Sequence, residues 1–289
     1  MKLSHFYNQV VRFGASRDPR GKKAKIKRYP DTAILYGDPN TEIHKIMVGI
    51  DIEVAELLLA KEVRDREGLD LVLSHHPEGS AYASLHEVMQ VQVDILDSLG
   101  VPRETAQKLL DERMQEVERR VLPQNHTRPV EAARLLDLPF MCMHTPADNH
   151  VFAFINDLLK TKKPKIVQDI VDMLMKVQEY KDAAKFSTGP RIISGNPKRA
   201  IGKISVEMTG GTEGSKDVFE KMRKAGVRTL ICMHLSEEHL KKVRDADINV
   251  VIAGHISSDT LGINLLLDRM EKEEKLEIIS CSGFKRIRR

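Results

Sequence analysis

Residues 71–77 read LVLSHHP, and this stretch decides both the fold class and the site of the chain. A short apolar run that ends in turn residues is typical of a buried strand in an α/β sheet. A second apolar run at 45–51 and a helical pattern at 54–67 come before it, and Gly68 ends that helix. Strand, helix and strand predict a β-α-β unit, in which the strands are parallel and the crossover is right-handed.

Two further apolar runs also end in histidine and are followed by an aspartate. Residues 139–148 read PFMCMHTPAD, and residues 250–259 read VVIAGHISSD. In α/β sheets the ligand crevice lies beyond the carboxyl ends of the strands. One histidine at a strand end is more often a hydrogen-bonded core or surface residue. Three such ends together favour a metal site assembled from distant segments.

The adjacent residues His75 and His76 bear on the number of metal ions. Side chains of neighbouring residues on an extended backbone point to opposite sides. Both rings can take part in one site if the chain turns at Pro77, or if each ring binds a different ion. The pair therefore favours two metals, or one metal with one ring as its ligand and the other ring supporting that ligand. Imidazole and carboxylate without thiolate predict Zn, Mn, Fe, Co or Ni. Two such divalent ions would activate water and clamp a phosphate or an acyl oxygen.

The composition is that of a globular protein. The 289 residues are 41% hydrophobic and 30% charged, which suits one large or two ordinary α/β domains. No apolar stretch approaches the roughly 20 residues that span a bilayer, and the first residues lack the apolar core of a signal peptide. The three cysteines are far apart, as expected for free thiols in a reducing compartment. We therefore predict a cytoplasmic protein with no membrane contact.

Basic residues are concentrated in two segments, although the net charge is only +4. Seven of them lie between Arg17 and Arg28, and residues 284–289 read FKRIRR. These segments could contact nucleic acid or an anionic substrate, but charge runs are more often a solvated loop or a frayed tail. The chain has no Trp and only 4% aromatic residues, so it offers few stacking platforms. We expect no nucleic-acid partner.

Strand and helix patterns alternate along the rest of the chain, which indicates an α/β fold. Residues 1 to about 45 are expected to be irregular or lightly structured, and 85–136 to be a helical insertion after the His-His motif. We predict two α/β domains with mixed sheets flanked by helices: a metal-site domain of 1–155 plus 248–289, and a second domain of 156–247. Further helices are predicted at 164–186, 217–225, 236–246 and 260–273, and further strands at 140–143, 201–208, 228–233, 249–253 and 276–281.

Four motifs in a fixed order resemble those of the Nif-three-like family, which is often labelled GTP cyclohydrolase I, type II. They are VGID at 48–51, SHHP at 74–77, HTPAD at 144–148 and GHISSD at 254–259, with looser matches at 210–215 and 232–239. The resemblance implies two α/β domains with a dinuclear metal centre between them. It also implies a homo-oligomer, a toroidal hexamer whose sites face an internal cavity. By motif, the implied metal ligands are His75, His76, Asp148, His255 and Asp259.

The chain departs from the family pattern in three places, none of which removes a ligand type. The family usually has Glu at the position of Asp259, so here the backbone must approach the metal or a water must bridge. The segment between His76 and His144 is longer than usual and mostly helical. The usual His-Thr-Asn-Leu-Asp reads HTPAD, which keeps Asp148 but alters the turn.

These features predict a metal-dependent hydrolase that acts on a nucleotide-like or phosphorylated small molecule. His144, or else His150, would be the general acid/base, and Arg and Lys near the cavity would neutralise phosphate. His144 could instead be a metal ligand, and His150 a surface-loop residue. The glycine-rich turn at 209–215 could hold phosphate on backbone N–H groups. The cluster at 234–239 could face the same cavity or form a solvated helix cap.

Two other classes of function are carried as alternatives. A metal chaperone, storage or regulatory protein would hold an exchangeable metal and hydrolyse no phosphoester. A scaffold or nucleic-acid partner would use the basic run 17–28. Its binding would fall steeply with salt and would survive loss of the metal ligands.

Overall fold

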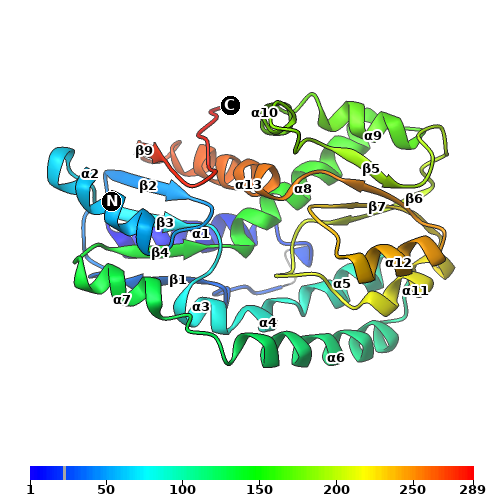
Figure 1. Ribbon diagram of the computed structural model, residues 1–289, viewed down its shortest axis with the longest axis horizontal. Helices are drawn as coiled ribbons and strands as arrows, with labels where there is room; N and C mark the ends of the chain where they lie inside the picture. Colours follow the sequence, from blue (N-terminus) through cyan, green and yellow to red (C-terminus); the bar gives the residue numbers. More distant parts are fainter. Residues whose placement is uncertain (22–23) are drawn as a thin grey trace.

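The protein has two β-sheets, each flanked by helices, placed along its longest axis (Figure 1). The computed structural model describes residues 1–21 and 24–289. In both sheets one edge strand, β1 or β5, is antiparallel to its neighbour, and the other pairs are parallel. The predicted mixed sheets are therefore confirmed. The first sheet has the order β1 (Thr32–Tyr36), β4 (Phe140–Met143), β3 (Leu71–Ser74), β2 (Lys45–Gly49), β9 (Glu277–Ser280), and the second β5 (Arg191–Ser194), β8 (Asn249–Ile252), β7 (Val227–Cys232), β6 (Lys203–Glu207).

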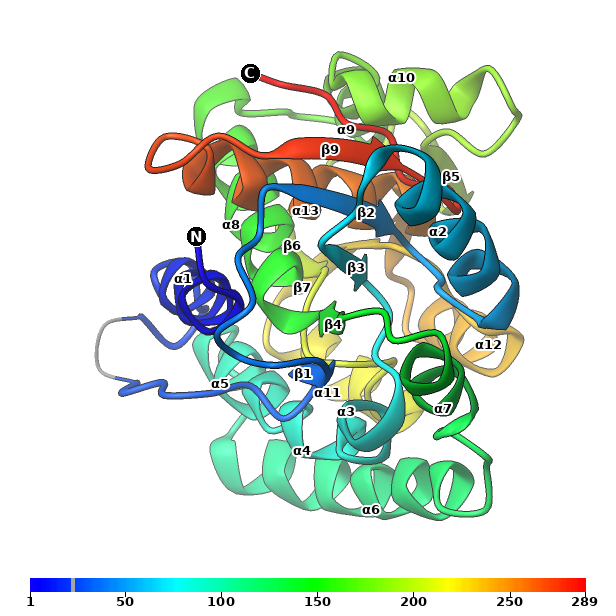
Figure 2. The same ribbon diagram turned by 90° about the vertical axis from the view of Figure 1, so that its left-hand side faces the viewer.

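The helices form groups that follow the two sheets. The predicted helical insertion is present after the His-His motif, and its longest helix, α6, lies at the bottom of Figures 1 and 2 and packs into the core of the second sheet. Beside the first sheet lie α1 (Leu3–Ala15) and α2 (Val54–Glu67). The insertion holds α3 (Gly79–Ala83), α4 (Leu85–Val88), α5 (Val91–Ser98), α6 (Arg103–Val121) and α7 (Arg128–Leu135). Around the second sheet lie α9 (Val167–Leu174), α10 (Gln178–Ala184), η2 (Lys216–Val218), α11 (Phe219–Lys224) and α12 (Glu237–Asp245).

Two long helices, α8 (Thr145–Lys162) and α13 (His255–Met270), lie between the sheets and join their cores. Residues of α13 such as Leu266 pack in the core of the first sheet, whereas Leu261 packs in the core of the second. The helices touch at Gly262, where a Cβ would lie 2.5 Å from the carbonyl oxygen of Ala147. Because α8 follows β4 and α13 follows β8, this contact brings the first turns of both helices together.

Two helices that shape this arrangement were not predicted from the sequence. Residues 1–45 are not irregular, because α1 buries an apolar face that includes Leu3 and Phe6, and β1 pairs with β4. Helix α8 was missed because Pro146 was interpreted as a turn. Proline is tolerated in the first helical turn, where its missing N–H has no partner inside the helix, and α8 places Pro146 there.

The predicted domain boundary at residue 248 does not coincide with the boundary of a sheet. β8 pairs with β5 and β7, so residues 249–252 belong to the second sheet. The chain returns to the first sheet only through α13, which packs on both sheets. The division into 1–155 plus 248–289 and 156–247 stays a prediction.

The basic C-terminal tail is docked and not frayed. The side chain of Arg286 is 6% exposed and pairs with Asp268 and Glu271, each at 2.5 Å. Of the basic run at 17–28, Lys22 and Lys23 lie outside the described residues. Within the described part of the chain, no helix combines the length and apolar character needed to cross a membrane.

Candidate metal centre

The end of β3 turns the adjacent histidines into the same space. The backbone N–H of His75 donates to Gly49 and that of His76 donates to Ile50, both at 2.9 Å. The Ser74 hydroxyl donates to the carbonyl oxygen of His76 at 2.7 Å. The strand therefore stops at Ser74, and the two imidazole centroids lie only 5.3 Å apart. The alternation of an extended strand does not apply to this pair, as the following Pro77 indicated.

The other site residues come from the first turns of α8 and α13. His144 precedes α8, and Asp148 lies one turn into it. His255 opens α13 directly after Gly254, whose φ of +111° favours glycine, and Asp259 lies one turn further. The helix starts at His255 and not at 260 as predicted, so His255 and Asp259 have the i, i+4 spacing that puts both on one face.

Two groups of side chains gather at this point, and both include His75. The first is His75, His76 and Asp259, and the second is His75, His144 and Asp148. His75 Nε2 lies 3.4 Å from Asp148 Oδ1 and 3.5 Å from Asp259 Oδ1. Asp259 Oδ2 lies 3.5 Å from Nε2 of His76 and 3.5 Å from Nε2 of His255. The structure thus brings all five predicted ligands, and His144, to one place.

Each of three histidines is held by its Nδ1 and presents its Nε2 to the centre. Nδ1 of His75 donates to the carbonyl oxygen of Met143 at 3.0 Å, and Nδ1 of His76 faces Asp51 at 2.6 Å. Nδ1 of His144 faces Asp31 at 2.8 Å. Because these oxygens only accept hydrogen bonds, Nδ1 carries a proton, and Nε2 is the ring nitrogen that faces the centre. This outer support is what metal-binding histidines typically have.

The atoms at the centre lack protein partners. Among the described residues, His75 Nε2, Asp148 Oδ1 and both carboxylate oxygens of Asp259 are buried without a hydrogen bond. Burial opposes ionisation of Asp259, but the nearby imidazoles of His75, His76 and His255 hold its pKa well below the usual range. Buried polar atoms without partners are costly, and an ion is the natural partner for this set of nitrogen and carboxylate donors.

Asp31 is a site residue that the sequence analysis missed. It is fully buried, and one carboxylate oxygen accepts hydrogen bonds from the His144 ring, the Thr145 hydroxyl and the Thr145 backbone N–H. The only signal in the sequence is an acid just before the apolar strand β1. Because β1 was not predicted, nothing placed Asp31 next to β4.

His150 is not at the centre, although it was a candidate general acid/base. It is buried on α8, its Nδ1 donates to the carbonyl oxygen of Pro146 at 2.8 Å, and it does not line the cavity beside the candidate ligands. Burial, with smaller contributions from Arg269 and Arg17, lowers the pKa of His150 to about 4. The structure therefore does not place His150 with the candidate ligands, and the surface-loop alternative is wrong because His150 is buried in α8.

We expect His150 to make the fold sensitive to acid. Its pKa falls from 6.5 in the unfolded chain to about 4 in the fold, so the unfolded chain binds more protons between these values. The contribution of His150 to the free energy of unfolding is fully present above pH 6.5. It is lost as the pH falls to 4, which lowers the free energy of unfolding by about 3 kcal/mol. Urea unfolding of chelated protein at pH 7, 5.5 and 4.5 should show a smaller acid loss for His150→Gln than for the parent. His126→Gln, with a partly exposed ring, is the control, and equal slopes for both variants would contradict the assignment.

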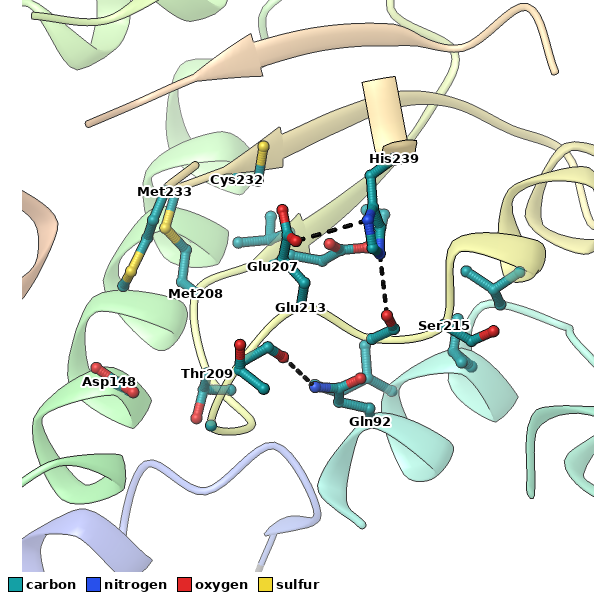
Figure 3. Close-up of a pocket in the computed structure, with 18 of the residues that line it drawn as sticks. Gln92, Asp148, Glu207, Met208, Thr209, Glu213, Ser215, Cys232, Met233 and His239 are labelled. Atoms are coloured by element: carbon teal, nitrogen blue, oxygen red, sulfur yellow. Dashed lines mark hydrogen bonds and ion pairs between the residues drawn. The ribbon is translucent and has the colours of Figure 1, made fainter. Parts of the chain in front are cut away.

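A cavity leads from the metal centre into the second sheet. Its volume is about 100 Å³, and His144, Asp148, His255 and Asp259 are among the residues that line it. The glycine-rich turn lines its inner part (Figure 3). Within the described residues no Lys or Arg lines the cavity, and the nearby Arg113 donates to the carbonyl oxygen of Glu213, so neutralisation of phosphate by such residues stays a prediction.

Two residues of the cluster at 234–239, His234 and His239, line this cavity. The His234 ring lies 4.8 Å from the His255 ring, centroid to centroid, which links the second sheet to the metal centre. Glu213 accepts a hydrogen bond from the backbone N–H of Ser236 at 2.6 Å. His239 bonds the hydroxyl of Ser236 and the carbonyl oxygen of Gly214, so it holds the turn in place. The sequence left open whether this cluster faces the cavity or forms a solvated helix cap. His234 and His239 face the cavity, because both line it.

The helical insertion clamps the glycine-rich turn through Gln92 of α5. Its amide nitrogen donates to the carbonyl oxygens of Gly210 and Thr212, at 2.7 and 2.8 Å. A Cβ on Gly214 would lie 2.5 Å from Gln92 Oε1, so the turn packs directly on this side chain. The inserted helices therefore shape the cavity wall.

We expect Gln92→Ala to destabilise the protein by about 1–3 kcal/mol, because two carbonyl groups lose their donor. The free energy of unfolding in urea measures this effect. Gln168→Ala is a suitable control, because the Gln168 amide bonds only Asp172 of its own helix. If both variants lost the same stability, the insertion would not be clamping the turn.

Comparison with known proteins agrees with this geometry. No family model and no curated protein matches the chain. A solved NIF3 superfamily protein from Sphaerobacter thermophilus is 29% identical with a TM-score of 0.79, over 95% of this chain and 97% of that one. The chain is thus similar to a NIF3 superfamily protein over almost its whole length, and it shares that protein's fold. The resemblance predicted from the four motifs is thereby confirmed.

More distant solved structures share this NIF3-like fold. Reduced HcgD from Methanocaldococcus jannaschii is 15% identical with a TM-score of 0.58, over 97% of each chain. The protein ybgI, of unknown function, is 15% identical with a TM-score of 0.56, over 98% of each chain. At these identities the likeness concerns the fold alone.

Proposed function

We propose that this NIF3-like chain binds two divalent transition-metal ions and hydrolyses a phosphorylated or nucleotide-like small molecule. The observation that carries the proposal is the orientation of the three imidazoles, each held at Nδ1 and presenting Nε2 to carboxylates that have no other partner. These nitrogen and carboxylate atoms lie 3.4–3.5 Å apart around one point without forming hydrogen bonds, and a shared ion would complete this arrangement.

The donor atoms divide between two ions in only a few ways. An imidazole Nε2 has one lone pair, so His75 serves one ion although it belongs to both groups. We assign His75, His144 and Asp148 to one ion, and His76 and His255 to the other. The two oxygens of Asp259 point to the two sides, Oδ1 toward His75 and Oδ2 toward His76 and His255. Asp259 is therefore the proposed bridge between the ions.

When bound, two such ions lower the pKa of a water molecule and stabilise charge on a phosphate. The protein residues contribute the rest. Asp31 fixes the ring of His144, and Asp51 fixes the ring of His76. The proposed ligands Asp148 and Asp259 would supply two negative charges to the four positive charges of two divalent ions, and the carboxylates of Asp31 and Asp51 lie one layer further out, behind the rings of His144 and His76. Because no Lys or Arg lines the cavity within the described residues, an anionic substrate group would be attracted chiefly by the ions themselves.

The proposal is tested by turnover with and without metal. Protein chelated and then loaded with Mn, Fe, Co, Ni or Zn is given p-nitrophenyl phosphate, bis-p-nitrophenyl phosphate and a set of nucleotides. Hydrolysis that needs one of the metals and returns when that metal is added back supports the hydrolase. Stoichiometric but exchangeable metal with no hydrolysis would instead favour the chaperone, storage or regulatory alternative. The toroidal hexamer is proposed from the resemblance only, and light scattering measures it.

A further inference from the structure

The inner part of the cavity can bury an apolar body. Beyond the glycine-rich turn, side chains of α5, α6, η2 and α11 form its walls, among them Ile95, Leu110, Val218 and Phe219. Leu110, Val218 and Phe219 also belong to the buried core of the second sheet, so this wall is firmly packed. Cavities of this kind bind organic groups by apolar contact and orient them with a few polar side chains.

The polar groups of the inner part are acidic. Glu207, at the end of β6, and Glu213, in the glycine-rich turn, both line it, and Figure 3 shows them in the middle of the cavity. A phosphate at this position would face two carboxyl groups and, among the described lining residues, no Lys or Arg. The expectation that the turn at 209–215 holds phosphate is therefore not supported, and an anionic group belongs at the metal end.

The two carboxyl groups differ in their partners. Burial opposes ionisation of Glu213, but His234 and the backbone N–H of Ser236 lower its pKa to about 2. It is already engaged in holding the turn. Glu207 has no hydrogen bond or ion pair with a described residue, and burial together with the charge of Glu213 raises its pKa to about 7. Glu207 is thus a carboxyl group inside a cavity with nothing in the described protein to bind.

We infer that Glu207 recognises an N–H donor group on an apolar or aromatic ligand whose other end reaches the metal centre. A nitrogen donor satisfies the unpartnered carboxylate, and the apolar walls enclose the body that carries it. A cationic amidinium and the N–H edge of a neutral heterocycle share this chemistry. The inference deepens the proposed function, because it names the substrate class for the same site.

The test titrates three ring compounds into the full-length protein by calorimetry: benzamidine as a cation, 2-aminopyrimidine as a neutral N–H edge, and benzoate as an anion. Each titration is made on zinc-loaded and on chelated protein, so that binding at the metal ligands is recognised. We expect Glu207→Gln to weaken benzamidine or 2-aminopyrimidine by at least about tenfold in both forms. The compound that is weakened identifies the donor as a cation or as a neutral edge.

The control is Glu238→Gln, on the exposed face of α12, which should leave all affinities unchanged. Ala106→Leu, which adds bulk to the apolar wall, gives a second variant in case Glu207→Gln does not fold, and it should also weaken binding. Unchanged affinities in both variants, or benzoate binding to chelated protein more tightly than either nitrogen compound, would overturn the inference. No turnover is measured, so a chain that binds benzamidine but hydrolyses nothing would refute the proposed hydrolase alone.

Discussion

Replacing Asp259 with Asn is expected to empty both metal positions. The side chain is 1% exposed, and its two oxygens face the histidines of both groups. An amide keeps the volume but loses the negative charge and one acceptor, so neither position keeps a complete donor set. We expect the affinity for zinc to fall at least about 100-fold at both positions. Hydrolysis should fall to the level of the chelated parent.

The measurement is zinc titration by calorimetry, with the melting temperature of chelated protein as the check on folding. Asp245→Asn, at the exposed end of α12, is the matched control and should bind zinc like the parent.

The proposed division of the ligands between two ions gives a sharper comparison. His76→Ala should lose one ion and keep the other, because His76 belongs to only one group. A variant Asp259→Asn that retained both ions would show that this carboxylate is not the bridge.

Replacing Asp31 with Ala is expected to harm stability and metal binding together. Three donors, on His144 and Thr145, lose their acceptor inside the protein, which should cost about 3 kcal/mol or more in the free energy of unfolding. The ring of His144 loses its support, so metal affinity should fall by about 10- to 100-fold.

Urea unfolding and zinc titration measure these two effects. The variant Asp31→Asn keeps the volume of the side chain and separates the effect on stability from the effect on metal binding. It should recover part of the stability but not all of the metal affinity. Asp38→Ala is the control, because Asp38 is exposed and bonds only Asn40 in its own turn. An Asp31→Ala protein with the parent's metal affinity would remove Asp31 from the site.

The sequence was informative where local pattern and tertiary position agree. The strand at 71–74 and the helix at 54–67 were predictable, because their apolar runs stop at clear turn residues. The histidines at strand ends were predictable as a cluster, since the carboxyl ends of parallel strands meet at one edge. The motif resemblance then supplied the choice of Asp148 and Asp259.

The sequence was uninformative where one local signal has two structural meanings. Pro146 reads as a turn, yet it sits in the first turn of α8, which is why Asp148 reaches the centre from a helix. Asp31 and Glu207 have no local signature at all. Each matters because of what lies beside it in space, Asp31 next to His144 and Glu207 next to the apolar wall of the insertion. Contacts of this kind are set by the fold.

Metal content is the most direct test of the central claim. Protein purified without chelator and without nickel affinity resin is measured by inductively coupled plasma mass spectrometry. The account predicts about two transition-metal ions per chain, bound by the imidazole and carboxylate groups around Asp259. Protein with no stoichiometric metal, even after Mn, Fe, Co or Zn is added back, would contradict it.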